Sequence, residues 1–137
     1  MTARRLPLAV AVIAMLPLTA CEKPAPQITV ESSGRVVNVD AFSYCFDGKC
    51  RERGGAERKI RVKGNTTVSF DVPKRVAAKG YVIRIREQSL FQAPRKESHY
   101  ALNFPAAGEQ TLPVTILEAG NGNTPTGVWK LQFDVKD

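Results

Sequence analysis

Two cysteines with a turn between them are the residues of this chain best suited to covalent chemistry. Cys45 and Cys50 flank Asp47-Gly48, and an Asp-Gly pair favours a two-residue hairpin turn of type I′. That turn puts the two cysteines opposite each other at a non-hydrogen-bonded position, where Cα atoms lie about 4.5 Å apart. We therefore expect a structural disulfide. A redox pair, which usually has two intervening residues, and a zinc site that also uses His99 are the alternatives.

His99 is the only histidine of the 137 residues, so any general acid–base chemistry by histidine would depend on it. The sequence has no G-x-S-x-G nucleophile turn, no H-E-x-x-H zinc motif and no glycine-rich phosphate loop. We therefore expect His99 to lie at or near the surface beside a strand, and we predict no cofactor and no catalytic residue. A small envelope hydrolase that uses His99, or a redox protein that uses the cysteine pair, is a less favoured alternative.

The N-terminal region has the pattern of a secretory signal peptide. Arg4 and Arg5 precede an uncharged, mostly apolar stretch over residues 6–18. This stretch is shorter than the roughly 20 residues that span a bilayer as a helix. Two prolines within it also disfavour a stable helix.

The cleavage region points to a lipid anchor. Leu18-Thr19-Ala20-Cys21 resembles the bacterial lipobox, whose cysteine thiol receives diacylglycerol before the chain is cut in front of it. This predicts a signal peptide over residues 1–20, a lipidated Cys21, a short proline-containing tether over 21–26 and a folded domain over 27–137. Two acyl chains give stable anchoring, so we expect a location on the extracytoplasmic face of the cell membrane. An ordinary signal peptide with a chance cysteine is the alternative.

Basic residues repeat at every second position in two segments of a chain with net charge +7. Lys59, Arg61 and Lys63 share one strand face by this spacing, and Arg84 and Arg86 share another. If the two strands are neighbours, the five side chains merge into one cationic surface that would bind anionic lipid headgroups or anionic wall polymers. The alternative is that they are the solvated outer faces of a sandwich. We expect no nucleic-acid partner for an exported domain.

The elements that must position these residues are strands. Apolar and polar residues alternate over eight segments, at 28–30, 37–39, 60–62, 68–72, 81–85, 100–104, 112–116 and 129–135. Strict alternation is typical of strands that bury only one face. Two sheets must therefore pack together with their apolar faces toward each other. We predict an all-β, immunoglobulin-like β-sandwich of about 7–9 strands after the signal peptide.

Several details of this sandwich follow from single residues. The predicted core includes Trp129, Phe133, Phe70, Tyr100 and Phe104, together with the alternating Ile and Val residues. A short helical turn at Ala77-Ala78 is expected after Pro73. Pro113 lies within a strand pattern, which favours an edge position or a bulge. The segment 88–98 is expected either to bind a partner or to tuck Phe91 into the core.

A set of spaced residues resembles an actinobacterial family of cell-envelope lipoproteins of unknown function. The residues that carry the resemblance are Ile28-Thr29-Val30, Tyr44-Cys45 with Cys50, Val68-Ser69-Phe70-Asp71-Val72-Pro73 and Gly127-Val128-Trp129. The resemblance covers most of the chain after the signal peptide. It implies an envelope location, assigns roles only to Cys21, Cys45 and Cys50, and brings no catalytic residue.

The sequence thus favours a membrane-anchored extracytoplasmic lipoprotein that is a non-enzymatic binding or structural module of the envelope. Its expected partners are the membrane, through the lipid anchor, and an envelope protein, an anionic polymer or a lipid. A lipoprotein inhibitor or immunity factor that reads its target with residues 88–98 is the alternative.

Overall fold

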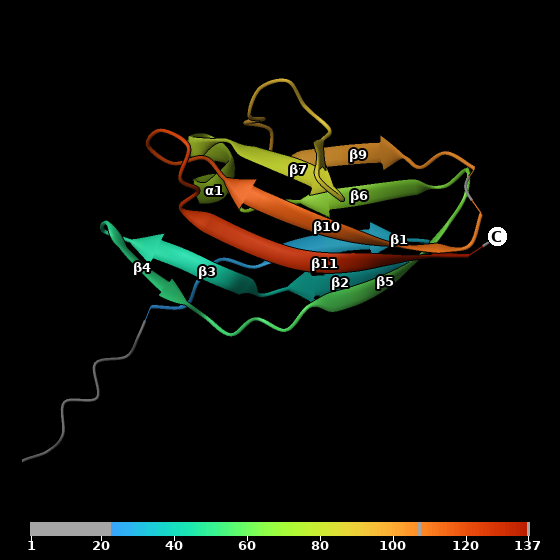
Figure 1. The fold of residues 1–137 in the computed structure, drawn as a ribbon, viewed down its shortest axis with the longest axis horizontal. Helices are drawn as coiled ribbons and strands as arrows, with labels where there is room; N and C mark the ends of the chain where they lie inside the picture. The colour runs from blue at the N-terminus through green and yellow to red at the C-terminus, as the bar shows by residue number, and fades with distance from the viewer. Residues whose placement is uncertain (1–22, 107, 137) are drawn as a thin grey trace, which may run out of the picture.

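The computed structural model describes residues 23–106 and 108–136, which fold as two packed β-sheets (Figure 1). The four-stranded sheet has the order β2 (Arg35–Val39), β1 (Ile28–Ser32), β6 (Thr67–Asp71) and β9 (His99–Asn103). The path through the seven-stranded sheet runs β4 (Lys49–Glu52), β3 (Ala41–Phe46), β11 (Gly127–Lys136), β10 (Gln110–Glu118), β7 (Tyr81–Ile85) and β8 (Gln88–Ser89). Its seventh strand, β5 (Arg58–Lys63), pairs with β11.

The predicted all-β sandwich of immunoglobulin-like type is confirmed, with more strands than expected. The described residues form eleven strands, of which β3, β4 and β8 are not among the eight alternating segments. In β3 the neighbours Tyr44 and Cys45 are both buried, which breaks the period of two. The β3–β11 register also shifts between Val128 and Trp129. β4 and β8 span only four and two residues, too few to establish a pattern.

The core lies between the sheets and is built mainly on β11 and β10. Every second residue of β11 is buried, Trp129 and Phe133 completely. Phe70 and Phe104 close the core from the other side, whereas Tyr100 is only partly buried against it. A fully buried aromatic or aliphatic side chain contributes about 1.5–3 kcal/mol, so these positions dominate the stability of the domain.

Strand β11 is ten residues long, so one of its edges pairs with two strands. Its first residues pair with β3 in antiparallel orientation, and residues Leu131–Lys136 pair with β5 in parallel orientation. The other edge of β11 pairs along its length with β10, which continues to β7. Two strands, β11 and β10, therefore separate β5 from β7.

Pro113 lies in β10, which is an internal strand and not the predicted edge strand. Its register with β11 is continuous, so there is no bulge at this position. The ladder between β10 and β7 begins one residue later, at Val114. The proline nitrogen, which carries no proton, thus falls just outside the ladder with β7, and this explains how an internal strand tolerates it.

One short helix closes an end of the sandwich. Helix α1 (Lys74–Lys79) follows Pro73 and ends at Gly80, whose φ of 97° is readily adopted only by glycine. The expected helical turn is thereby confirmed. Val76 and Ala77 are buried in the core. No helix of the described part of the chain is long and apolar enough to cross a membrane.

Candidate functional site

The β3–β4 hairpin carries the predicted disulfide. Cys45 pairs with Cys50 in the strand register, their Cα atoms lie 3.9 Å apart, and the two sulfur atoms are bonded. Asp47 and Gly48 both have positive φ, 49° and 76°, as a type I′ turn requires. The Cys45 amide donates to Thr126 on the opposite side, so the cysteines occupy the non-hydrogen-bonded position that the sequence predicts. The disulfide therefore links the two strands of the hairpin covalently.

The chain enters the domain beside this hairpin. Cys21 and the predicted signal peptide over residues 1–20 lie outside the described residues, which begin at Lys23. Trp129 Nε1 donates a 2.9 Å hydrogen bond to the Pro26 carbonyl oxygen, and Ala25 packs against the core. Lys23 Nζ lies 5.5 Å from the centre of the Phe46 ring. Residues 23–26, predicted as part of the tether, are therefore held against the domain surface.

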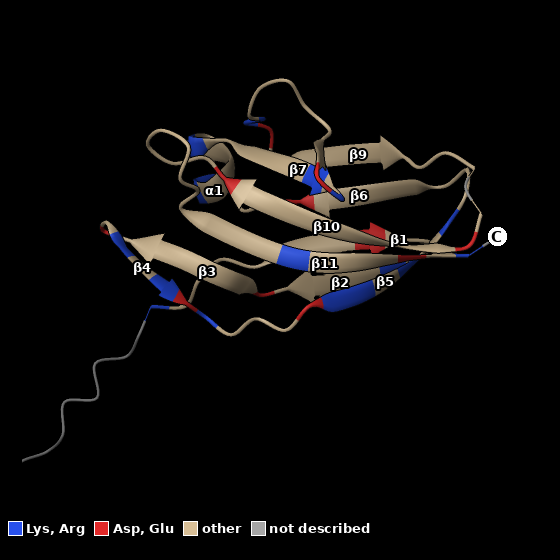
Figure 2. Cartoon of the chain, viewed as in Figure 1, with Lys and Arg blue, Asp and Glu red and all other residues tan. Residues whose placement is uncertain are grey.

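Cations cover the aromatic residues at this end of the molecule. The guanidinium carbons of Arg53 and Arg75 lie 5.2 Å and 5.1 Å from the centre of the Phe46 ring. Arg75 and Lys79 lie 5.4 Å and 5.8 Å from the centre of the Tyr44 ring. Figure 2 shows the basic segments of β4 and α1 at this end. A cavity of about 340 Å³ opens here and is lined by Lys23, Phe46, Asp47, Lys49, Arg51 and Arg53.

Behind the aromatic residues lies a buried carboxylate. The Glu118 side chain is completely buried and accepts hydrogen bonds from Lys79 Nζ at 2.9 Å, Thr126 Oγ1 at 2.6 Å and Tyr44 OH at 3.1 Å. The hydrogen bond to Glu118 raises the pKa of Lys79 above its usual value, although partial burial opposes this. Three donors thus hold the carboxylate, and one of them carries a charge.

Sequence reasoning missed Glu118, although a signal was present. Glu118 stands at the next alternate position after the buried residues Leu112, Val114 and Ile116. Extending the period of two by one step places a carboxylate on the core-facing side of the strand. A carboxylate at such a position indicates a buried network with a basic partner.

The condition for one merged cationic surface is not met, because the two basic strands are not neighbours. Lys59, Arg61 and Lys63 project from β5, and Arg84 projects from β7, but β11 and β10 lie between the two strands. Three strand spacings separate them by about 14 Å. Arg86 lies in the turn after β7, with φ of 56°, and its guanidinium donates to Gln110 Oε1 at 2.9 Å. Its conformation therefore breaks the period of two that Arg84 and Arg86 were expected to share.

His99 forms a cross-strand pair on the outer face of the four-stranded sheet. Its Nδ1 lies 2.7 Å from Asp71 Oδ1, and both side chains are 59% exposed. Within residues 23–106 and 108–136, the imidazole has no hydrogen bond to a hydroxyl group. Nor does this part of the chain gather three or more His, Cys, Asp or Glu side chains that could hold a metal ion.

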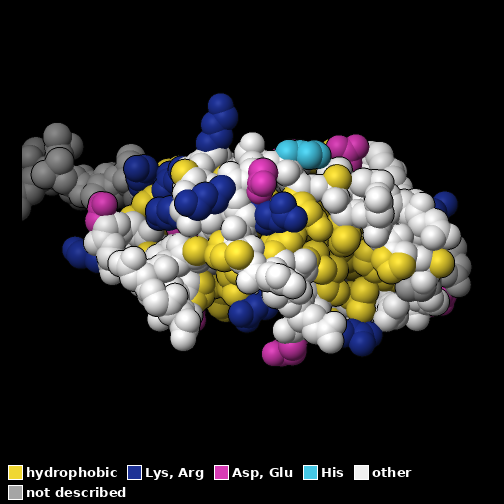
Figure 3. Space-filling model, turned by 90° about the horizontal axis from the view of Figure 1, so that it is seen from above, with side chains coloured by type: hydrophobic (Ala, Val, Ile, Leu, Met, Phe, Trp, Pro, Cys, Tyr) yellow, Lys and Arg dark blue, Asp and Glu magenta, His cyan; other side chains and the backbone are white. Residues whose placement is uncertain are grey.

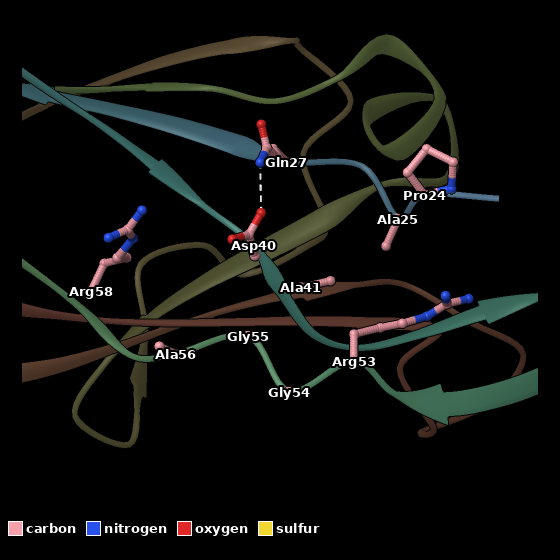
Figure 4. Close-up of a pocket in the computed structure, with 10 residues that line it drawn as sticks. All are labelled: Pro24, Ala25, Gln27, Asp40, Ala41, Arg53, Gly54, Gly55, Ala56 and Arg58. Carbon is pink, nitrogen blue, oxygen red and sulfur yellow. Dashed lines mark hydrogen bonds between the residues drawn. The ribbon is translucent and has the colours of Figure 1, made fainter. Parts of the chain in front are cut away.

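A large open pocket lies where the N-terminal segment meets β3 (Figure 4). It has a volume of about 910 Å³ and is lined by residues 24, 25, 27, 40, 41, 53–56 and 58. Gln27 Nε2 donates to Asp40 Oδ1 at 2.6 Å across one wall. Gly55 forms another wall and approaches β3 so closely that a Cβ atom there would lie 2.6 Å from the Ala41 oxygen. The pocket is open, its lining mixes polar and apolar groups, and arginines lie at opposite sides.

The segment 88–98 tucks Phe91 against the domain, which is one of its two predicted roles. The Phe91 ring packs edge-on against Tyr81 and Tyr100 at centroid distances of 6.3 Å and 4.7 Å. Burial raises the pKa of Tyr81, whose hydroxyl donates to the Glu97 carbonyl oxygen. Figure 3 looks onto this face and shows hydrophobic side chains gathered across it.

A second, more apolar pocket of about 340 Å³ lies between residues 85–90 and the residues around Phe104.

Comparisons with known proteins give a family but no activity. A family model described as "Protein of unknown function (DUF2771)" matches residues 21–132. No curated protein and no solved structure matches the chain. The match begins at Cys21.

Proposed function

The chain belongs to the DUF2771 family of proteins of unknown function, and we propose that it is a lipid-anchored binding or structural module of the cell envelope. The observation that carries the proposal is the Leu18-Thr19-Ala20-Cys21 sequence at the end of an apolar stretch. A short link between the domain and such an anchor is consistent with the packing of the chain on the domain surface from Lys23 onward. The envelope of an actinobacterium is the setting that the sequence resemblance favours.

The chemistry-bearing residues support a non-enzymatic role. Cys45 is used in a hairpin disulfide with Cys50. Glu118 is used in a buried network. His99 pairs with a carboxylate on an exposed sheet face. Each of these groups thus has a structural partner that accounts for its position, so we propose a binding or structural role in place of catalysis.

The test is the chemical state of Cys21. We expect the protein in the membrane fraction of its native cells, with an N-terminal Cys21 whose mass includes diacylglycerol. Cys21→Ser should abolish both the added mass and the membrane association. Cys50→Ser is the matched control, because it removes a different cysteine and should leave lipidation unchanged. A soluble protein with an unmodified Cys21 would contradict the proposal.

An inhibitor or immunity factor is a second candidate, favoured by the apolar pocket beside residues 88–90. The half-buried Leu90 and Ile85 line it together with the buried Phe104 and Leu112. Such a pocket could accept an apolar side chain of a protein partner. Cross-linking in intact envelopes should then yield one adduct that Leu90→Asp removes. An adduct pattern unchanged by Leu90→Asp would dismiss this candidate.

A further inference from the structure

We propose that the end of the domain next to Cys21 docks onto an anionic phospholipid bilayer. The inference rests on the proposed lipid anchor, because an acylated Cys21 is what would bring this end to a membrane. We define the anchor-end surface by its basic side chains and their central aromatic ring: Lys23, Lys49, Arg51, Arg53, Arg75 and Phe46.

The position of the anchor in the sequence determines which end of the domain meets the bilayer. Lys23 follows Cys21 by two residues, and two residues span at most about 7 Å. Lys23 itself is held on Phe46, at 5.5 Å from the ring centre. Charges interact across about 8 Å at physiological ionic strength. An acylated Cys21 therefore holds the anchor-end surface within electrostatic range of the headgroups.

Basic side chains outnumber carboxylates among the described residues of this surface. Three cations, Lys23, Arg53 and Arg75, lie within 5.5 Å of the centre of a single Phe46 ring. The adjoining cavity of about 340 Å³ has four basic residues in its lining and one carboxylate, that of Asp47. Guanidinium and ammonium groups gathered around one ring can donate several charge-assisted hydrogen bonds to a phosphate group.

The composition of the surface also fits a bilayer interface. Arginine and lysine side chains lay their apolar stems along an aromatic ring while their charged ends reach the headgroup layer. Phe46 is half-buried beneath them, and Figure 2 shows β4 and its basic residues at the protruding end of the sheet. Phosphate diesters of the headgroups are the matching anions.

The basic residues of β5 do not serve this purpose, because they lie at the opposite end of β11. The β3–β4 hairpin joins β11 at Gly127–Trp129, whereas β5 pairs with Leu131–Lys136. Arg61 also stands opposite the carboxylate of Asp134 in the register. The basic residues of β5 therefore provide a matched control, because they carry the same kind of charge at a different place.

The experiment reconstitutes the full-length protein, purified from its native cells, into vesicles of phosphatidylcholine, with or without phosphatidylglycerol. Flotation of the vesicles reports the anchor, and hydrogen exchange of the β3–β4 amides reports docking. We expect exchange at β4 to slow when phosphatidylglycerol is present and to recover at high salt. The docking constant should fall roughly fivefold for each basic residue removed, thus roughly 25-fold for Lys49→Gln with Arg51→Gln. The control, Arg61→Gln with Lys63→Gln, should dock as the unaltered protein does.

Each outcome decides between the claims. Failure to float with either vesicle overturns the lipid anchor and, with it, the proposed function. Flotation without slower exchange at β4 overturns the docking surface alone. An equal loss of docking in the Arg61→Gln/Lys63→Gln control also overturns it, because attraction would then depend on net charge only. Slowing by soluble polyphosphate or by inorganic phosphate, but not by phosphatidylglycerol, overturns the assignment to a lipid. Thermal unfolding of both variants confirms that they are folded.

Discussion

Replacing Lys79 with methionine tests how the domain keeps a charged Glu118 in its core. The Glu118 side chain is completely buried, while that of Lys79 is 50% exposed. Removing one partner of a fully buried ion pair costs about 3–5 kcal/mol. Solvent screens the half-exposed lysine, and two hydroxyl groups still donate to Glu118, so we expect Lys79→Met to cost about 2 kcal/mol.

The assay is urea unfolding followed by the fluorescence of Trp129, the only tryptophan of the chain and a fully buried one. In a Glu118→Gln background the carboxylate charge is absent, so Lys79→Met should cost less than about 1 kcal/mol. The difference, about 1–2 kcal/mol, is the coupling between the two side chains. Gln at position 118 keeps the size of the buried group, which limits the change to its charge.

The matched control is Lys136→Met. Lys136 Nζ lies 4.0 Å from Asp134 Oδ1, and their side chains are 44% and 40% exposed, so this surface pair contributes about 0–1 kcal/mol. Should Lys79→Met cost no more than Lys136→Met, or should the two changes at 79 and 118 add without coupling, the reasoning about Glu118 is refuted.

Three further predictions concern stability. A hydrogen bond raises the pKa of Lys79, and burial raises the pKa of Tyr81. The folded state therefore holds both protons more tightly than the unfolded state does. The free energy of unfolding should therefore be unaffected by these groups below about pH 10 and fall as the pH rises above it; a flat urea midpoint there contradicts this. Cys45→Ser with Cys50→Ser should cost about 2 kcal/mol, and a reductant should lower the unaltered protein's midpoint equally. Gly55→Ala places a Cβ 2.6 Å from a carbonyl oxygen of β3, so it should cost about 1–3 kcal/mol in thermal unfolding; an unchanged midpoint would show that the segment moves aside.

Local pattern was sufficient to predict eight of the eleven strands in the described residues and the disulfide. Alternation predicts which residues of β11 face the core, and Trp129 and Phe133 are completely buried there. The Asp47-Gly48 turn sets the register of the hairpin, which places Cys45 opposite its partner. Both predictions succeed because they depend on residues within a few positions of one another.

The candidate surfaces were harder to predict because they depend on residues far apart in the sequence. Nothing local to β5 indicates that it lies parallel to the last strand of the chain. The cluster on Phe46 combines Lys23 from the N-terminal segment, Arg53 from just after β4 and Arg75 from helix α1. Glu118 likewise receives its charged partner from α1.

The sequence by itself was enough to predict the all-β class and the hairpin disulfide, and it is the sole basis for the proposed signal peptide and lipid anchor. Only the tertiary structure decided that the basic strands are separated, that Arg86 turns away from Arg84, and that cations gather on Phe46 beside the N-terminal segment. A period of two specifies the face of a strand on which a residue lies, but not which strands become neighbours. Strand order depends on long-range pairing and packing, and the charge pattern of the surface follows from that order.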